Sequence, residues 1–80
     1  MTKDPSTDTK VSVDLSEAWR ALNTGDTSSA RKIFEKAVHG DPSDPESWTG
    51  LGMCLERTLN YEAAANSYQR ALTLEPNIFA

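Results

Sequence analysis

The sequence predicts an all-α fold of four antiparallel helices, arranged as two helix–turn–helix units. Two observations lead to this prediction. Apolar residues recur at three- and four-residue spacing in four segments, which is the period of an amphipathic helix, and short polar breakers rich in Gly, Pro, Asp and Asn separate them. The alternation of apolar and polar residues that is typical of a strand occurs nowhere in the chain. Because short connections join antiparallel neighbours, we expect the helices to pack in chain order.

The first helix follows a polar tail. Residues 1–12 cannot bury enough apolar surface to offset the entropy of ordering, so we expect them to be flexible and place the folded domain at residues 13–80. Asp14 caps the first helix, and Glu17 completes a capping-box-like pair. Gly25 suits the left-handed conformation that often follows a helix. The apolar face of this helix consists of Leu15, Ala18, Trp19 and Leu22.

The second and third helices follow the same pattern. The second spans about residues 28–39 and stops before Pro42. Its apolar face consists of Ala30, Ile33, Phe34, Ala37 and Val38. The third opens at Asp44-Pro45-Glu46, where an acidic cap, a proline in the first turn and a carboxylate near the positive end of the helix dipole are all favourable. Its buried side is expected to consist of Trp48, Leu51, Gly52, Leu55 and Leu59.

The fourth helix is expected to begin after a cap at Asn60 and to end before Pro76. Its apolar residues again follow helical spacing, and we expect them to face the third helix. They are Tyr61, Ala64, Ala65, Tyr68, Ala71 and Leu72.

The second and fourth helices match each other at an offset of 34 positions, obtained by subtracting residue numbers. The offset relates Ala30 to Ala64, Phe34 to Tyr68, Ala37 to Ala71, Pro42 to Pro76, and the capping residues Asp26 and Asn60 to each other. A repeat of this period is a helix–turn–helix unit that must stack on a neighbour to bury its apolar side. The offset therefore indicates two copies of one structural unit.

The second copy carries a recognisable pattern. In order it holds a tryptophan, a Leu-Gly pair, a small alanine, an aromatic residue, a second alanine and a proline, namely Trp48, Leu51, Gly52, Ala64, Tyr68, Ala71 and Pro76. In this order and period the chain resembles the tetratricopeptide-repeat (TPR) family. The resemblance implies a short right-handed α-solenoid with repeat one at about residues 13–44 and repeat two at about 45–78. It also implies binding of another protein, as a peptide or helix, rather than catalysis.

The first helix departs from the family pattern. In the 34-residue register Asp14 stands where repeat two has Trp48. One interpretation is that the helix is rotated, or its turn is one residue shorter, so that its apolar residues pack inward. The other is that the register holds and these residues form an apolar binding stripe. The atypical nature of terminal repeats favours the first interpretation. The residues concerned are Leu15, Trp19 and Leu22, which stand opposite Thr49, Met53 and Glu56.

The resemblance also implies where a partner binds. TPR proteins commonly hold peptides in a concave groove lined by the first helix of each repeat. If the register holds, the partner-binding groove of this chain consists of Leu15, Trp19, Leu22, Thr49, Met53, Glu56 and Arg57.

An apolar flank of the fourth helix should remain uncovered, because no third repeat follows in this sequence. An exposed apolar patch marks an interaction site. We therefore expect a homo-oligomer or a subunit of a larger complex, with a fragment of a longer repeat array as the alternative left open. The predicted oligomer or capping patch consists of Tyr61, Ala65, Leu72, Leu74, Ile78 and Phe79.

Composition and charge argue against other classes of function. With 12 acidic and 8 basic residues the formal net charge is −4, which does not favour nucleic-acid binding. The chain has no apolar run long enough to cross a membrane and no signal-peptide-like start, so we expect no membrane insertion and a cytoplasmic location. One cysteine, Cys54, and one histidine, His39, cannot build a four-ligand zinc site, and Cys54 is expected to be a buried small hydrophobe.

The residues offer no pairing of a nucleophile with a base, so we expect no enzymatic activity, no cofactor and no metal. The predicted function is that of a small TPR adaptor or assembly factor that binds a peptide or helix of a partner protein. The alternative is a structural accessory subunit or self-associating scaffold that packs through its uncovered C-terminal helix.

Overall fold

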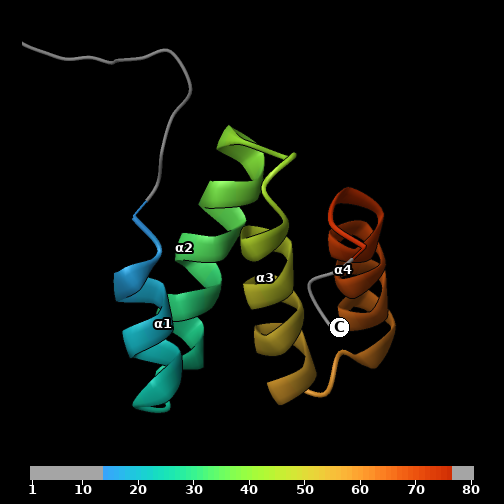
Figure 1. Cartoon of the computed structure of the whole chain (residues 1–80). Helices are drawn as coiled ribbons and strands as arrows, with labels where there is room; N and C mark the ends of the chain where they lie inside the picture. The colour runs from blue at the N-terminus through green and yellow to red at the C-terminus, as the bar shows by residue number, and fades with distance from the viewer. Residues whose placement is uncertain (1–13, 77–80) are drawn as a thin grey trace, which may run out of the picture.

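The computed structural model describes residues 14–76, in which all regular structure is helical, as predicted. Each helix packs against the next in chain order, so that the helices stand side by side in two antiparallel hairpins (Figure 1). The first hairpin is called repeat one and the second repeat two. The predicted tail and two residues of the predicted patch, Ile78 and Phe79, lie outside the described residues. The helices are α1 (Ser16–Asn23), α2 (Thr27–Gly40), α3 (Pro45–Arg57) and α4 (Tyr61–Leu74).

Both hairpins turn in the same way. The N–H of Gly25 donates to the carbonyl of Leu22 at 3.2 Å, and 34 positions later the N–H of Leu59 donates to that of Glu56 at 3.0 Å. The φ angles at the two turns are also alike, 91° at Gly25 and 66° at Leu59. The 34-residue register therefore holds through the turn of repeat one, and that turn is not one residue shorter.

Two of the predicted caps form through their side chains. The carboxylate of Asp26 accepts the N–H of Ser29 at 3.2 Å at the start of α2. The carboxylate of Asp44 accepts the N–H of Glu46 at 3.1 Å at the start of α3, and its other oxygen accepts the hydroxyl of Ser47 at 2.7 Å. The bonds from Ser29 and Glu46 each satisfy a backbone N–H that the first turn of a helix leaves without a partner.

The other two caps differ from the prediction. At the start of α1, Leu15 occupies the cap position without a side-chain bond, and Asp14 accepts the N–H and hydroxyl of Ser16 at 3.0 and 2.8 Å in a tight turn just before the helix. Asn60 occupies the cap position of α4, but its amide donates to the hydroxyl of Thr58 at 3.1 Å instead of capping the helix. In both places the side chain bonds to a residue two positions away and does not accept a hydrogen bond from the first turn of the helix.

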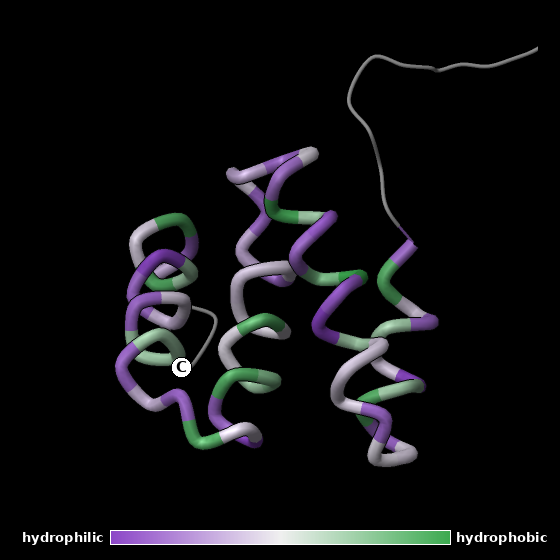
Figure 2. The backbone as a smooth tube through the Cα atoms, turned by 180° about the vertical axis from the view of Figure 1, so that it is seen from behind, coloured by the Kyte–Doolittle hydropathy of each residue, from purple (hydrophilic) through white to green (hydrophobic). Residues whose placement is uncertain are grey.

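The core lies along the contacts between successive helices, and apolar residues are spaced along each helix rather than gathered in blocks (Figure 2). Phe34 is fully buried at its centre and meets Trp19 edge-on, with 4.9 Å between ring centroids. Gly50 lets α3 approach this ring, because a Cβ atom at that position would overlap it. The buried apolar residues are Ala18, Leu22, Ala30, Phe34, Ala37, Val38, Leu51, Cys54, Leu55, Ala64 and Ala71.

Four residues that the periodicity placed inward are exposed. Leu59 is 70% exposed because it occupies the left-handed turn position that Gly25 fills in repeat one. Tyr61, Ala65 and Leu72, which were also expected in the uncovered flank, lie on a side of α4 that no described helix covers. The spacing was right for a helix, but one flank of this helix lacks a neighbour.

Candidate functional site

A shallow hollow of about 390 Å³ lies between α3 and α4. Thr49, Met53 and Glu56 line it from α3, and Tyr68 lines it from α4. The spacing of the three α3 residues, four and then three positions apart, puts them on one stripe of the helix. Three residues of the predicted groove are thus brought together, and the surface that they present is largely apolar.

Tyr68 is the residue of this hollow that sequence reasoning missed, because its match with Phe34 suggested an inward position. Its hydroxyl donates to a carboxylate oxygen of Glu56 at 2.8 Å. Burial, and then the bond to the Glu56 carboxylate, raise the pKa of Tyr68 to about 12. On the other side of the ring α3 comes close, since a Cβ atom on Gly52 would lie 2.8 Å from Cε1 of Tyr68. The ring is therefore held between α3 and α4 with one edge facing the hollow.

The remaining residues of the predicted groove lie elsewhere. Leu22 is 2% exposed, and its carbonyl accepts a hydrogen bond from Nη1 of Arg57 at 2.9 Å. The guanidinium therefore links the end of α3 to the end of α1. Trp19 is half-buried and donates its indole N–H to Glu46 at 2.8 Å. Leu15 is half-buried against the core. The register of repeat one holds, and these side chains of α1 nevertheless pack inward.

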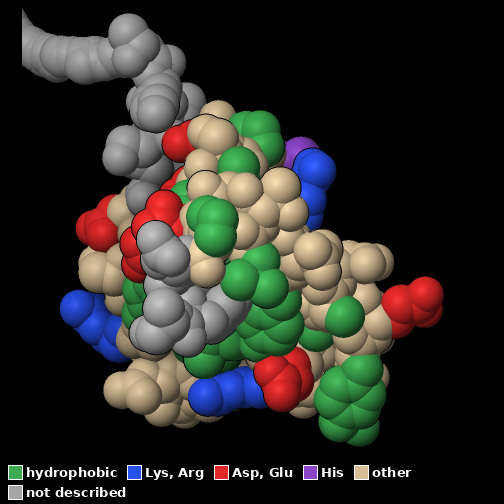
Figure 3. Space-filling view, turned by 45° about the vertical axis from the view of Figure 1, so that its right-hand side comes forward, with side chains coloured by type: hydrophobic (Ala, Val, Ile, Leu, Met, Phe, Trp, Pro, Cys, Tyr) green, Lys and Arg blue, Asp and Glu red, His purple; other side chains and the backbone are tan. Residues whose placement is uncertain are grey.

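The exposed flank of α4 forms a second apolar surface. Tyr61 is 63% exposed, Leu72 37% and Leu74 39%, and Ala65 is exposed between them. Figure 3, which brings the α4 side forward, shows apolar side chains gathered here with charged side chains near the edges. Tyr61, Ala65 and Leu72 lie within about 40° of one another around α4 and are called the α4 patch below, whereas Leu74 lies on the opposite side of the helix.

Leu74 lines a smaller hollow of about 210 Å³ together with Arg70 and Pro42. The guanidinium of Arg70 lies 5.1 Å from the centroid of the Trp48 ring, and the indole N–H of Trp48 donates to the carbonyl of Pro42 at 2.7 Å. Trp48, the tryptophan of the repeat pattern, thus has a structural role: it contacts both the α2–α3 connection and α4.

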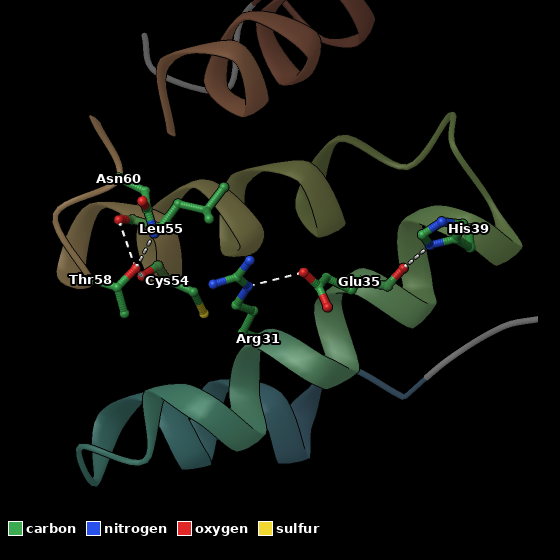
Figure 4. Close-up of polar contacts among 7 residues, drawn as sticks. All are labelled: Arg31, Glu35, His39, Cys54, Leu55, Thr58 and Asn60. Atoms are coloured by element: carbon green, nitrogen blue, oxygen red, sulfur yellow. Dashed lines mark hydrogen bonds and ion pairs between the residues drawn. The ribbon is translucent and has the colours of Figure 1, made fainter. Parts of the chain in front are cut away.

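The single cysteine lies inside the fold, as expected. Cys54 is fully buried, and this burial raises the pKa of its thiol. Arg31 extends from α2 beside it and pairs with Glu35 at 3.0 Å (Figure 4). His39 lies one turn further along α2, with Nδ1 2.7 Å from the carbonyl oxygen of Glu35. The ion pair and the histidine contact both join residues of α2 that stand one helical turn apart.

Within residues 14–76, no group of three or more His, Cys, Asp and Glu residues is placed to hold a metal ion. In the same part of the chain, no helix has the length and apolar character needed to cross a membrane.

Comparisons with known proteins agree with the repeat pattern. A family model described as tetratricopeptide repeat matches residues 15–77. The chain is 36% identical over 61 residues to the PEX5-related protein of Mus musculus, a match that covers 76% of this chain and 11% of that protein. The human PEX5-related protein matches at 36% over 61 residues, with 76% and 10% covered. The general transcriptional corepressor ssn6 of Schizosaccharomyces pombe matches at 31% over 68 residues, with 76% and 6% covered. The chain thus spans at most 11% of the length of these relatives.

Proposed function

The chain belongs to the tetratricopeptide-repeat family, and on that premise we propose that it is a protein–protein interaction module, a small adaptor or assembly factor that binds a peptide or helix of a partner protein. The proposed binding surface consists of the three α3 residues and the α4 tyrosine that line the larger hollow. We leave the inward-packed residues of α1 and the tethered Arg57 out of it. A cytoplasmic location stays a prediction from the sequence.

The observation that supports this proposal is the composition of the hollow. Met53 offers a flexible, polarisable side chain that adapts to different apolar partners. Tyr68 and Glu56 add a fixed hydrogen-bonded pair beside it, and the carboxylate gives the site a negative charge at neutral pH. An apolar surface with a few polar groups placed at its edge is the usual form of a site that recognises a peptide or helix.

A site-specific cross-link tests this proposal. Met53 is replaced with the photoreactive amino acid p-benzoylphenylalanine, and the variant is irradiated in the cells from which the protein comes. The matched control carries the same amino acid at Lys36, which is exposed on α2 and remote in sequence from the hollow. We expect an adduct from position 53 that position 36 does not give, and we expect Glu56→Arg to reduce its yield. Identical adducts from both positions would show that the hollow is not the binding surface.

The α4 patch supports a second candidate function, that of a structural accessory subunit or self-associating scaffold. Tyr61 and Leu72, exposed on the same side of α4, make an apolar surface that a copy of the same chain can cover. Light scattering after size-exclusion chromatography over a dilution series measures this directly. A dimer that Tyr61→Asp converts to a monomer would support the scaffold role, whereas a monomer at every concentration would rule it out.

A further inference from the structure

Each residue that lines the larger hollow has a counterpart 34 positions earlier in repeat one, by subtraction of residue numbers. The hollow of repeat two is therefore structurally equivalent to a site on repeat one. The contacts made at the site on repeat one indicate which kind of element packs there. The counterparts of Thr49, Met53, Glu56 and Tyr68 are Leu15, Trp19, Leu22 and Phe34.

In repeat one a helix, α3, covers this site. Its Gly50 lies against the ring of Phe34, where a side chain would overlap the ring. Near the start of α3, Glu46 accepts the indole N–H of Trp19, and at its end Arg57 donates to the carbonyl of Leu22. One helix thus meets three of the four counterpart residues along its length.

Exposure shows that the equivalent site on repeat two is open. Phe34 is fully buried and Val38 is 7% exposed, whereas Tyr68 is half-buried and Leu72, the residue 34 positions after Val38, is 37% exposed. Helices α2 and α4 thus both carry an aromatic residue and an aliphatic residue at these two equivalent positions. The difference is that α3 covers α2, and no described helix covers α4.

We propose that the hollow, together with Leu72, binds an amphipathic helix of a partner protein, which lies on repeat two as α3 lies on repeat one. The helix carries a glycine where it crosses Tyr68 and a lysine or arginine seven residues later, opposite Glu56. This inference rests on the proposed function and specifies the partner's chemistry at the same site.

The glycine requirement follows from the internal comparison. At Phe34 the backbone of α3 approaches so closely that only a residue without a side chain fits. Tyr68 occupies the equivalent position, and its ring is restrained by Gly52 on one side and by its bond to Glu56. A helix that approaches Tyr68 as α3 approaches Phe34 therefore needs a glycine at the crossing point.

The basic residue follows from charge. Arg57 stands seven residues after Gly50, which is two helical turns, and it reaches the carbonyl of Leu22. Repeat two offers the same carbonyl and adds a carboxylate, because Glu56 stands at the position of Leu22. A cation of the partner helix therefore meets both a carbonyl oxygen and a negative charge, which favours a charge-assisted hydrogen bond.

A second copy of this chain is a poor occupant of the site. In a head-to-tail stack α1 would take the place of α3, so that Glu17 would stand where Leu51 is and Arg20 where Cys54 is. Leu51 and Cys54 are buried at 8% and 0% exposure, whereas Glu17 and Arg20 are exposed in this structure. Burial of two charges at apolar positions is strongly unfavourable, so the occupant is a helix of different sequence.

The test uses a helix of known chemistry. The probe is a peptide with the sequence of residues 45–57, carrying Cys54→Ala to prevent disulfides and held helical by a covalent bridge between its positions 49 and 53. The full chain is labelled with ¹³C at its methionine methyl groups, which gives signals from Met53 and Met1 alone. We expect the peptide to shift the Met53 signal saturably and to leave the Met1 signal unchanged.

Two matched peptides test the specificity. A probe with Gly50→Leu should bind at least about tenfold more weakly, because the added side chain meets Tyr68. A probe with Arg57→Glu should also bind more weakly, by about threefold or more, and should recover affinity for the Glu56→Lys variant of the chain. Equal binding of the glycine and leucine probes, or no shift of Met53 at millimolar peptide, would overturn the proposal.

The outcomes also separate this inference from the proposed function. A Met53 signal that moves with protein concentration alone would show that a second copy covers the hollow. A cross-link from position 53 to a partner segment that is not helical would keep the interaction function and refute the helix. Failure of both the cross-link and the peptide would refute the two proposals together.

Discussion

Alanine at the two glycines of α3 should have different effects, although the glycines stand two residues apart on one helix. Gly50→Ala adds a methyl group that overlaps the ring of Phe34, which is fully buried and held edge-on by Trp19. Gly52→Ala adds the same group 2.8 Å from the ring of Tyr68. The added methyl group would overlap Phe34 more deeply than Tyr68, and Phe34 is fully buried whereas Tyr68 is half-buried.

The expected difference in the free energy of unfolding between the two variants follows from two opposing effects. Alanine in place of glycine in a helix interior stabilises by about 1 kcal/mol at either position. Overpacking of a filled core costs about 1–3 kcal/mol, which applies at Gly50 in full and at Gly52 only in part. We therefore expect Gly50→Ala to be less stable than Gly52→Ala by about 1–2 kcal/mol. For a domain of this size that difference corresponds to a Tm lower by about 4–16 °C in Gly50→Ala than in Gly52→Ala.

Circular dichroism at 222 nm during thermal and urea unfolding measures both variants. The helix-propensity gain is common to the two, so the difference between them isolates packing. Phe34→Leu in the Gly50→Ala background should recover part of the loss, because the smaller side chain leaves room for the added methyl group. Equal stabilities, or a Gly50→Ala variant more stable than the parent, would refute the close approach of α3 to Phe34.

Three further predictions concern single residues. Leu59→Gly should stabilise the chain by about 1 kcal/mol in urea unfolding, because the left-handed turn is strained for leucine and Gly25 fills the same position in repeat one. Tyr68 should ionise with a pKa of about 12 in an absorbance titration at 295 nm. Because this pKa is raised above its unfolded value, the neutral form stabilises the fold below pH about 10 and that contribution is lost as pH rises towards 12. Tyr68→Phe should remove this alkaline loss. Cys54 should react slowly with a thiol reagent until urea unfolds the chain, and rapid reaction of the native protein would contradict its burial.

The helices and the register were predictable because each depends on local chemistry. Helical spacing, proline and aspartate at the start of α3, and the 34-residue offset are all visible in the sequence, and the structure reproduces them. Asp14 and Asn60 were less predictable. Each side chain bonds instead to a residue two positions away, Asp14 as an acceptor and Asn60 as a donor, and spacing alone does not decide between a cap and such a local bond.

The hollow was only partly predictable. Thr49, Met53 and Glu56 followed from the resemblance to TPR proteins, but Tyr68 was assigned to the core because it aligns with Phe34. Whether an aromatic ring at this position is covered depends on the next helix and not on its own segment. Leu22 is a similar case, because one interpretation of the register placed it in the groove and the structure buries it in the core.

Leu22 and Glu56 are equivalent positions in the two repeats, and their different side chains make the two sites chemically different. Both residues stand at the same point of the hairpin, and the carbonyl of each accepts the same turn hydrogen bond. Leu22 is buried in the core and its carbonyl also accepts a hydrogen bond from Arg57 of α3, whereas Glu56 is exposed and paired with the hydroxyl of Tyr68. An apolar helix end placed over Glu56 would have to desolvate its carboxylate, which costs free energy unless a cation compensates it. The site on repeat two therefore disfavours a helix whose end is apolar opposite Glu56. It favours a partner helix that carries a positive charge there.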